Sequence, residues 1–72
     1  MYKLDLQGYR VDKTTDVIDC FIYEHLLFGS KEVEIITGDS RVVKGVVKEV
    51  VENYGLKCKP HIYNPHTLTI TL

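Results

Sequence analysis

The chain contains no tryptophan, only two cysteines and two prolines, and no long hydrophobic run. A membrane-spanning helix needs ~20 apolar residues in a row, so the sequence predicts no membrane span and no membrane partner. The first residues, 1–5, lack the apolar segment of a secretory signal peptide. Cys20 and Cys58 lie far apart and do not have the spacing of metal or redox motifs. We therefore expect a cytoplasmic protein with two free thiols.

A strong excess of charge of one sign is also missing. Nine Lys and Arg residues against ten Asp and Glu residues give a net charge of −1. The whole chain therefore has no general attraction for nucleic acid, and such binding would need a local basic patch. A length of 72 residues with 44% hydrophobic content is typical of one small domain, which we expect to span residues 1–72.

The first half of the chain predicts a strand followed by a helix. Residues 2–7 alternate apolar and polar side chains, which is the period of a strand, and Gly8 interrupts the pattern. Asp12 is suited to cap a helix that runs to about Phe28. Gly29 then supplies a helix stop signal.

The second half predicts a strand, a helix and a hairpin. A strand is expected at about residues 32–37. Valine pairs at 42–43, 46–47 and 50–51 recur every four residues, which indicates one stripe of a helix that starts near Val42 and ends at Tyr54-Gly55. Residues 56–63 and 67–72 read as the strands of a hairpin whose turn is 64–66.

The expected element order is βαβαββ, which gives an α/β (α+β) two-layer sandwich with a mixed four-stranded sheet and two helices. Two strand–helix–strand crossovers predict largely parallel pairing, with the last strand antiparallel to its neighbour. The loops after the first two strands should then open at the same edge of the sheet, where ligands of open α/β sheets bind.

The loop from Gly38 to Arg41 is the stronger binding candidate of the two. Gly38 permits a positive φ, and Ser40 or Asp39 can cap the following helix. Free backbone N–H groups at such a strand–loop–helix junction suit a phosphate, although a plain helix cap without a ligand is the alternative.

Basic side chains follow both loops and can track a nucleic-acid backbone, or they can be ordinary solvated surface: Arg10, Lys13, Arg41 and Lys44. A second basic stripe, with an aromatic ring for stacking, is expected along one face of the third strand unless this is only the wet side of the hairpin: Lys57, Lys59, His61 and Tyr63. Cys58, His61 and His66 are possible zinc ligands by residue type, but Cys58 and His61 should point to opposite faces, so we predict no metal site there.

Two segments resemble motifs of the Smr (small MutS-related) domain family: Leu4-Asp5-Leu6-Gln7-Gly8 and Val33-Glu34-Ile35-Ile36-Thr37-Gly38. The resemblance covers essentially the whole chain. It implies a fold similar to the C-terminal domain of translation initiation factor three. It also implies DNA or RNA as the partner and, as in several family members, nicking or cleavage of nucleic acid.

The first family motif is Leu-Asp-Leu-His-Gly, in which Asp5 matches the aspartate and Gln7 stands in place of the histidine. Asp5 and Gln7 share one face of a strand. A carboxylate there can hold a metal or activate water, whereas glutamine has no acid–base chemistry. By its motif positions, the resemblance implies Asp5 and Gln7 as the catalytic residues. The alternative is that Asp5 orients a neighbouring loop. Mg²⁺ or Mn²⁺ is implied only if the protein is a nuclease.

The second family motif is a His/Thr-Gly-x-Gly loop. Thr37 and Gly38 match it, Asp39 fills the variable place, and Ser40 replaces the last glycine. The resemblance implies these phosphate-binding residues: Gly8, Arg10, Lys13, Thr37, Gly38, Asp39, Ser40, Arg41 and Lys44.

Three functions remain open at this stage. The favoured hypothesis is a monomeric nucleic-acid-binding module that recognises structure rather than sequence. The second is a structure-selective DNA or RNA nicking endonuclease in which Asp5 is the essential carboxylate. The third is a small protein–protein interaction module without nuclease activity that uses the sheet face or the valine-rich helix.

Overall fold

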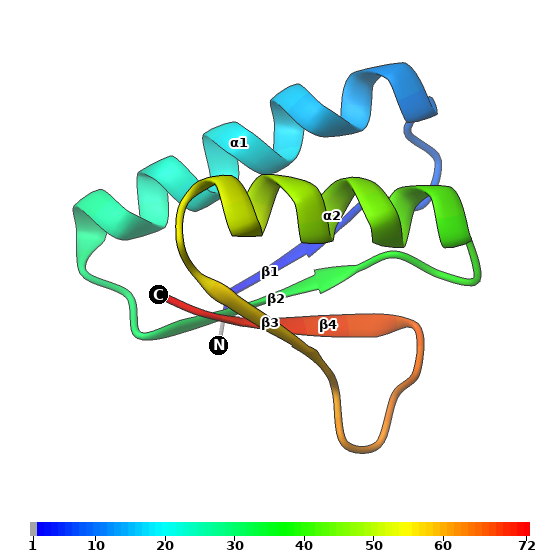
Figure 1. Ribbon diagram of the computed structural model, residues 1–72. Helices are drawn as coiled ribbons and strands as arrows, with labels where there is room; N and C mark the ends of the chain where they lie inside the picture. The colour runs from blue at the N-terminus through cyan, green and yellow to red at the C-terminus, as the bar shows by residue number, and fades with distance from the viewer. Residues whose placement is uncertain (1) are drawn as a thin grey trace.

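A computed structural model describes residues 2–72 of the chain. Both helices lie on the same side of a four-stranded sheet, which makes two layers (Figure 1). This confirms the predicted architecture and the βαβαββ order. The elements are β1 (Tyr2–Asp5), α1 (Val11–Phe28), β2 (Glu32–Ile36), α2 (Arg41–Asn53), β3 (Lys57–Pro60) and β4 (Thr67–Thr71).

The strands are arranged in the order β1-β2-β4-β3. Only β1 and β2 pair in parallel, because β4 inserts between β2 and β3 and runs antiparallel to both. The expected largely parallel sheet is therefore wrong, whereas the antiparallel last strand is confirmed. Burial explains the order: residues 67–70 are buried, as suits a central strand. β3 is more exposed and contains Pro60, which cannot donate to a ladder and belongs at an edge.

The helix α2 confirms the argument from valine spacing. Its buried residues are Val43, Val47, Val50 and Val51, which form one stripe toward the sheet. The Ser40 hydroxyl accepts a hydrogen bond from the Val43 N–H at 3.1 Å, so Ser40 rather than Asp39 is the cap. The helix begins at Arg41, one residue before the expected start.

The helix α1 ends as predicted but begins differently. Gly29 adopts φ 76° after Phe28, and the cap N–H groups reach His25 and Leu26 carbonyls. At the other end the N-cap is Arg10, which makes no side-chain cap bond. The predicted capping role of Asp12 is therefore wrong, because the helix starts two residues too early for it. Asp12 lies in the first turn, where its carboxylate is 3.3 Å from the Arg10 guanidinium.

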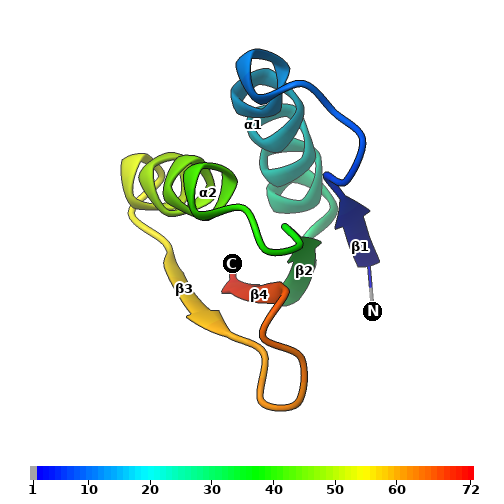
Figure 2. The same ribbon diagram turned by 90° about the vertical axis from the view of Figure 1, so that its right-hand side faces the viewer.

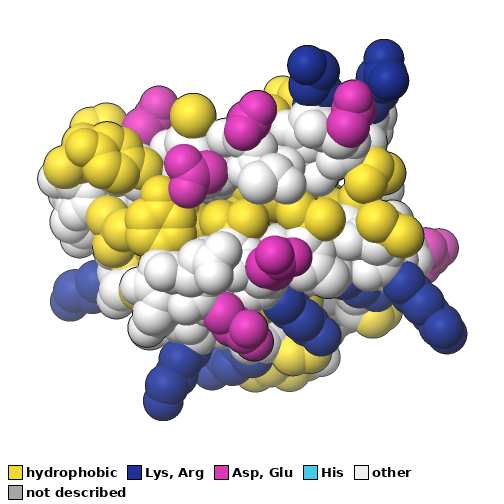
Figure 3. Space-filling view, turned by 45° about the horizontal axis from the view of Figure 1, so that its top comes forward, with side chains coloured by type: hydrophobic (Ala, Val, Ile, Leu, Met, Phe, Trp, Pro, Cys, Tyr) yellow, Lys and Arg dark blue, Asp and Glu magenta, His cyan; other side chains and the backbone are white. Residues whose placement is uncertain are grey.

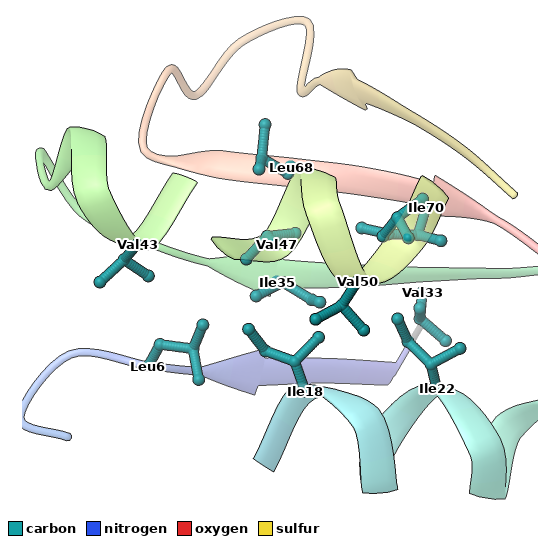
Figure 4. Packing of buried hydrophobic residues seen from close by; sticks show 11 residues of the cluster. Leu6, Ile18, Ile22, Val33, Ile35, Val43, Val47, Val50, Leu68 and Ile70 are labelled. Atoms are coloured by element: carbon teal, nitrogen blue, oxygen red, sulfur yellow. The ribbon is translucent and has the colours of Figure 1, made fainter. Parts of the chain in front are cut away.

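The hydrophobic core lies between the helix layer and the sheet (Figure 4). β2 and β4 contribute Val33, Ile35, Leu68 and Ile70, all at most 3% exposed. Burying side chains of this size stabilises the fold by about 1.5–3 kcal/mol each. The helices and the residue that follows β1 supply the remaining buried apolar residues: Leu6, Ile18, Ile22, Val43, Val47, Val50 and Val51.

The hairpin differs from the prediction in its loop. β3 ends at Pro60, so the connection to β4 spans residues 61–66 instead of 64–66. The His61 N–H donates to the Thr67 carbonyl at 3.0 Å, and the Thr67 N–H donates to the Asn64 carbonyl at 3.1 Å. His61 and Tyr63 therefore belong to a folded loop, and the expected stripe along the third strand ends at Lys59. Neither helix found within residues 2–72 is long and apolar enough to cross a membrane.

Candidate functional site

Three loops lie at one end of the sheet, where β1 and β2 end and β4 begins (Figure 2). They are residues 6–10, 37–40 and 61–66, and we call this end the loop rim. Both helices also begin here (Figure 1). The prediction that the first two loops open at one edge is confirmed. The third loop joins them because β4, rather than β3, pairs with β2.

The first and second loops are in direct contact. The Leu6 N–H donates to the Ile36 carbonyl at 2.9 Å. The side chain of Gln7 lies against Gly38, such that a Cβ atom at Gly38 would be 3.1 Å from Gln7 Nε2. Gly38 also has a φ of 67°, which side-chain-bearing residues rarely adopt. The two sequence segments that carry the family resemblance therefore form one continuous surface.

Asp5 shapes the first loop. Its Oδ1 atom accepts a hydrogen bond from the Gln7 N–H at 2.9 Å, which closes a turn of the kind that Asp and Asn often make. The turn continues through Gly8, whose φ is 89°, and the Tyr9 N–H donates to the Leu6 carbonyl at 3.2 Å. The alternative in which Asp5 orients a loop thus has a direct structural counterpart, while Asp5 and Gln7 both remain exposed.

The second loop does not offer all the free N–H groups that we expected. The N–H groups of Thr37 and Gly38 both donate to the His66 carbonyl, at 2.8 and 3.1 Å. Thr37 Oγ1 reaches the same oxygen at 3.1 Å. The backbone N–H groups of Thr37 and Gly38 are therefore already paired in this conformation, and phosphate binding by these two residues stays a prediction. The N–H groups of Arg41 and Val42, in the first turn of α2, have no helical partner and remain suitable.

His66 is a rim residue that the sequence suggested only as a metal ligand. Its Nδ1 atom lies 2.8 Å from Asp39 Oδ1, and the side chains are 47% and 91% exposed. Asp39 is therefore partnered by an imidazole, which reduces the repulsion that its charge would exert on a bound anion when His66 is protonated. Only the pairing of Ile36 with Thr67 brings His66 here, so a correct strand order was needed to find it.

The basic residues of the rim are dispersed. Arg10 is paired with Asp12, Lys13 and Arg41 are exposed, and Lys44 is half-buried. On the helix-covered side of the molecule, Lys and Arg side chains stand at several separate places along the edge (Figure 3). The rim therefore offers individual contacts to an anionic chain and no single dense basic patch.

The rim does not have the donor set of a metal site. Within residues 2–72 no group of three or more His, Cys, Asp or Glu side chains is placed to hold a metal ion. Cys58 packs against the hydrophobic core, and burial raises the pKa of its thiol, with the positive charge of Lys48 opposing the shift. Among these described residues, no such group of protein ligands is placed for the Mg²⁺ or Mn²⁺ that a nuclease function implies.

The family model of the Smr domain matches residues 4–69. The chain belongs to the Smr domain family. Neither the curated proteins nor the solved structures contain a significant match, so the likeness to the C-terminal domain of initiation factor three stays a prediction. The matched range of this Smr domain includes all three loops of the rim.

Proposed function

We propose that this Smr domain binds nucleic acid through the loop rim and grips the sugar–phosphate backbone. The observation that carries the proposal is the contact between Gln7 and Gly38, because it joins the two family segments into one surface. Membership of the Smr family supports the same function. Both helices begin at this surface, and the positive ends of their dipoles favour an anionic ligand.

The groups available for phosphates are the first-turn N–H groups of α2 and the side chains of Arg10, Lys13, Arg41 and Lys44. Contacts of this type position a backbone without reading base sequence. We therefore expect selectivity for the form of the nucleic acid rather than for its sequence. Because phosphate contacts release counterions, the affinity should fall steeply as the salt concentration rises.

Fluorescence anisotropy with labelled single-stranded, duplex and branched DNA and with RNA tests the proposal. The double variant Arg10→Gln/Arg41→Gln should weaken binding to every probe. It should also reduce the salt slope by about one for each phosphate contact removed. The matched control Lys31→Gln/Lys48→Gln removes the same charge from exposed positions elsewhere and should bind as the wild type does. Absence of wild-type binding to all probes at low salt would overturn the proposal.

Cleavage of the nucleic acid is not part of this proposal. The Asp5 carboxylate already accepts the Gln7 N–H, and the Gln7 amide cannot transfer protons. We expect supercoiled plasmid and RNA to remain intact with the protein and Mg²⁺ or Mn²⁺. Nicking by the wild type that disappears in Asp5→Ala would show instead that Asp5 is catalytic.

The valine-rich helix does not favour a protein-interaction function. Val43, Val47, Val50 and Val51 are buried in the domain's own core, so that stripe is not open to a partner. Nucleic-acid binding at the rim is the function that we propose.

A further inference from the structure

The face of the sheet opposite the helices contains a groove that the backbone contacts at the rim do not use. One row of residues crosses all four strands on this face: Lys3, Glu34, Thr69 and Lys59. The β3–β4 loop borders the row. Between them is a groove of about 240 Å³ lined by residues that include Glu34, Lys59, His61 and Tyr63. A hollow of this size is smaller than a typical drug-sized site and suits a single ring system.

The loop that borders this groove is held at both ends. His61 Nε2 lies 3.1 Å from the buried carboxylate of Glu34, and His61 Nδ1 accepts the Tyr63 N–H at 3.1 Å. At the other end, the His66 carbonyl accepts the Thr37 and Gly38 N–H groups, and the His66 N–H donates to Asn64 Oδ1 at 3.0 Å. These hydrogen bonds order the loop in the free protein. The conformational entropy cost of ordering it is therefore met on folding and not on ligand binding.

This fixed loop displays an aromatic ring. The side chains at its tip are among the most exposed of the large hydrophobic residues, with Ile62 at 85% and Tyr63 at 89%. The Tyr63 ring lies 6.3 Å from the His61 ring, centroid to centroid, at an angle of 59°. Tyr63 therefore contributes little to the core, and its ring faces are open to a planar partner.

The charges around the groove decide what kind of partner fits. Glu32 and Glu34 line it, so it disfavours a phosphate, whereas their carboxylates and the Thr69 hydroxyl accept hydrogen bonds from amino groups. Lys59 and Lys3 stand at the two sides of the row and can face phosphates outside the groove. A second hollow, of about 140 Å³, is lined by His61, Asn64 and Thr67 and continues toward the rim.

We infer that the groove under the β3–β4 loop binds an unpaired nucleobase, with Tyr63 stacking on the base while the backbone lies on the rim. The occupant is an aromatic base with an exocyclic amino group, because the lining offers acceptors and a stacking face. A paired base inside a duplex cannot reach the groove. The preferred substrate class is therefore nucleic acid with single-stranded segments. This inference rests on the proposed binding at the rim.

Anisotropy titrations at low salt with three matched probes test it: oligo(dC), an abasic strand of the same length, and an oligo(dC)·oligo(dG) duplex. Loss of one base–aromatic stack should weaken oligo(dC) binding by about 5- to 100-fold in Tyr63→Ala. Tyr63→Phe keeps the ring and should stay within about twofold of the wild type. The abasic strand and the duplex should not distinguish Tyr63→Ala from the wild type.

Tyr23→Ala serves as the control, because Tyr23 is also exposed, at 55%, but lies on α1. It should bind all three probes as the wild type does. Equal binding of oligo(dC) by the wild type and Tyr63→Ala would overturn the inference and leave the rim proposal intact. Failure of the wild type to bind oligo(dC) would overturn the inference, and failure to bind every probe of both experiments, RNA and branched DNA included, would overturn the rim proposal with it.

Discussion

The two faces of the sheet carry opposite kinds of residue, although the same four strands form both. Under the helices lie Val33, Ile35, Leu68 and Ile70, all fully or almost fully buried. The other face of the same strands carries Glu34, Thr67 and Thr69, which are also buried, and the ordered β3–β4 loop beside them.

The difference separates what stabilises the domain from what the domain presents. Burial of the apolar face gives the free energy of folding. The open face keeps a carboxylate that is costly to remove from water, and Glu34 tolerates its position because His61 and Lys3 lie 3.1 and 3.9 Å from its oxygens. These polar partners fix the loop that carries Tyr63. The open face therefore orders an exposed loop and contributes less than the apolar face to the free energy of folding.

The largest expected difference in stability between the two faces is that between two adjacent isoleucines on opposite faces of β2. Ile35 is fully buried, whereas Ile36 is half-buried on the open face. Ile35→Ala should lower the free energy of unfolding by about 2–5 kcal/mol, because it leaves a cavity in the core. Ile36→Ala should cost about 1 kcal/mol, in proportion to its smaller burial.

Urea denaturation followed by circular dichroism measures both isoleucine variants under the same conditions. Equal losses for Ile35→Ala and Ile36→Ala would mean that the open face contributes as much to stability as the core does. The contrast between the two faces would then be wrong.

A second test concerns the buried carboxylate. Glu34→Ala removes the partner of His61 and should lower the free energy of unfolding by about 1–3 kcal/mol, the usual cost of losing a hydrogen bond to a charged group. Glu32 lies on the same face but is less buried, and Glu32→Ala should change stability by no more than about 0.5 kcal/mol. Faster amide hydrogen exchange of residues 61–66 in Glu34→Ala alone would confirm that Glu34 holds the loop.

The sequence was most informative on the apolar face and least informative on the open one. The valine spacing predicted α2, and Gly29 and Ser40 predicted helix ends, because these signals are local. The insertion of β4 between β2 and β3 is a long-range choice that no local pattern encodes. It moved the third loop to the rim, where the His66 carbonyl takes the Thr37 and Gly38 N–H groups that we had expected to bind phosphate.

The candidate site could also be predicted only in part, because long-range strand pairing brings its residues together. Gln7 and Gly38 were singled out in separate segments, and parallel pairing of β1 with β2 brings them together. The roles of Asp39 and Glu34 depend on histidines of the third loop, which are distant in sequence. The predicted cap, Asp12, lies two residues after the actual N-cap, Arg10, at a boundary that caps alone determine poorly.

A third test uses two glycines to separate effects on the stability of the fold from effects on nucleic-acid binding. Gly38 and Gly29 both have positive φ, at 67° and 76°, so Ala at either position should cost about 1–2 kcal/mol of stability. A Cβ at Gly38 would also meet Gln7 Nε2 at 3.1 Å, whereas nothing lies within 4 Å of one at Gly29. Only Gly38→Ala should therefore weaken nucleic-acid binding.

Parallel thermal unfolding and anisotropy measurements on the two glycine variants check this expectation. If Gly29→Ala weakened binding as much as Gly38→Ala, the effect would reflect lower stability and not the contact with Gln7.

The smallest expected effect comes from a polar contact within the helix layer. The Tyr54 hydroxyl donates to Asp19 Oδ1 at 2.8 Å, and this hydrogen bond raises the pKa of Tyr54 above its usual value of 10.0. A raised folded-state pKa means that the contact stabilises the fold below pH 10 and that the contribution is lost as the pH rises through the folded-state pKa. The stability difference between the wild type and Tyr54→Phe should therefore be small, constant from neutral to mildly alkaline pH, and shrink above pH 10.

Urea denaturation across this pH range measures the difference, with Tyr23→Phe as the control. A difference that grows as the pH rises above 10 would show that Asp19 does not hold the Tyr54 hydroxyl.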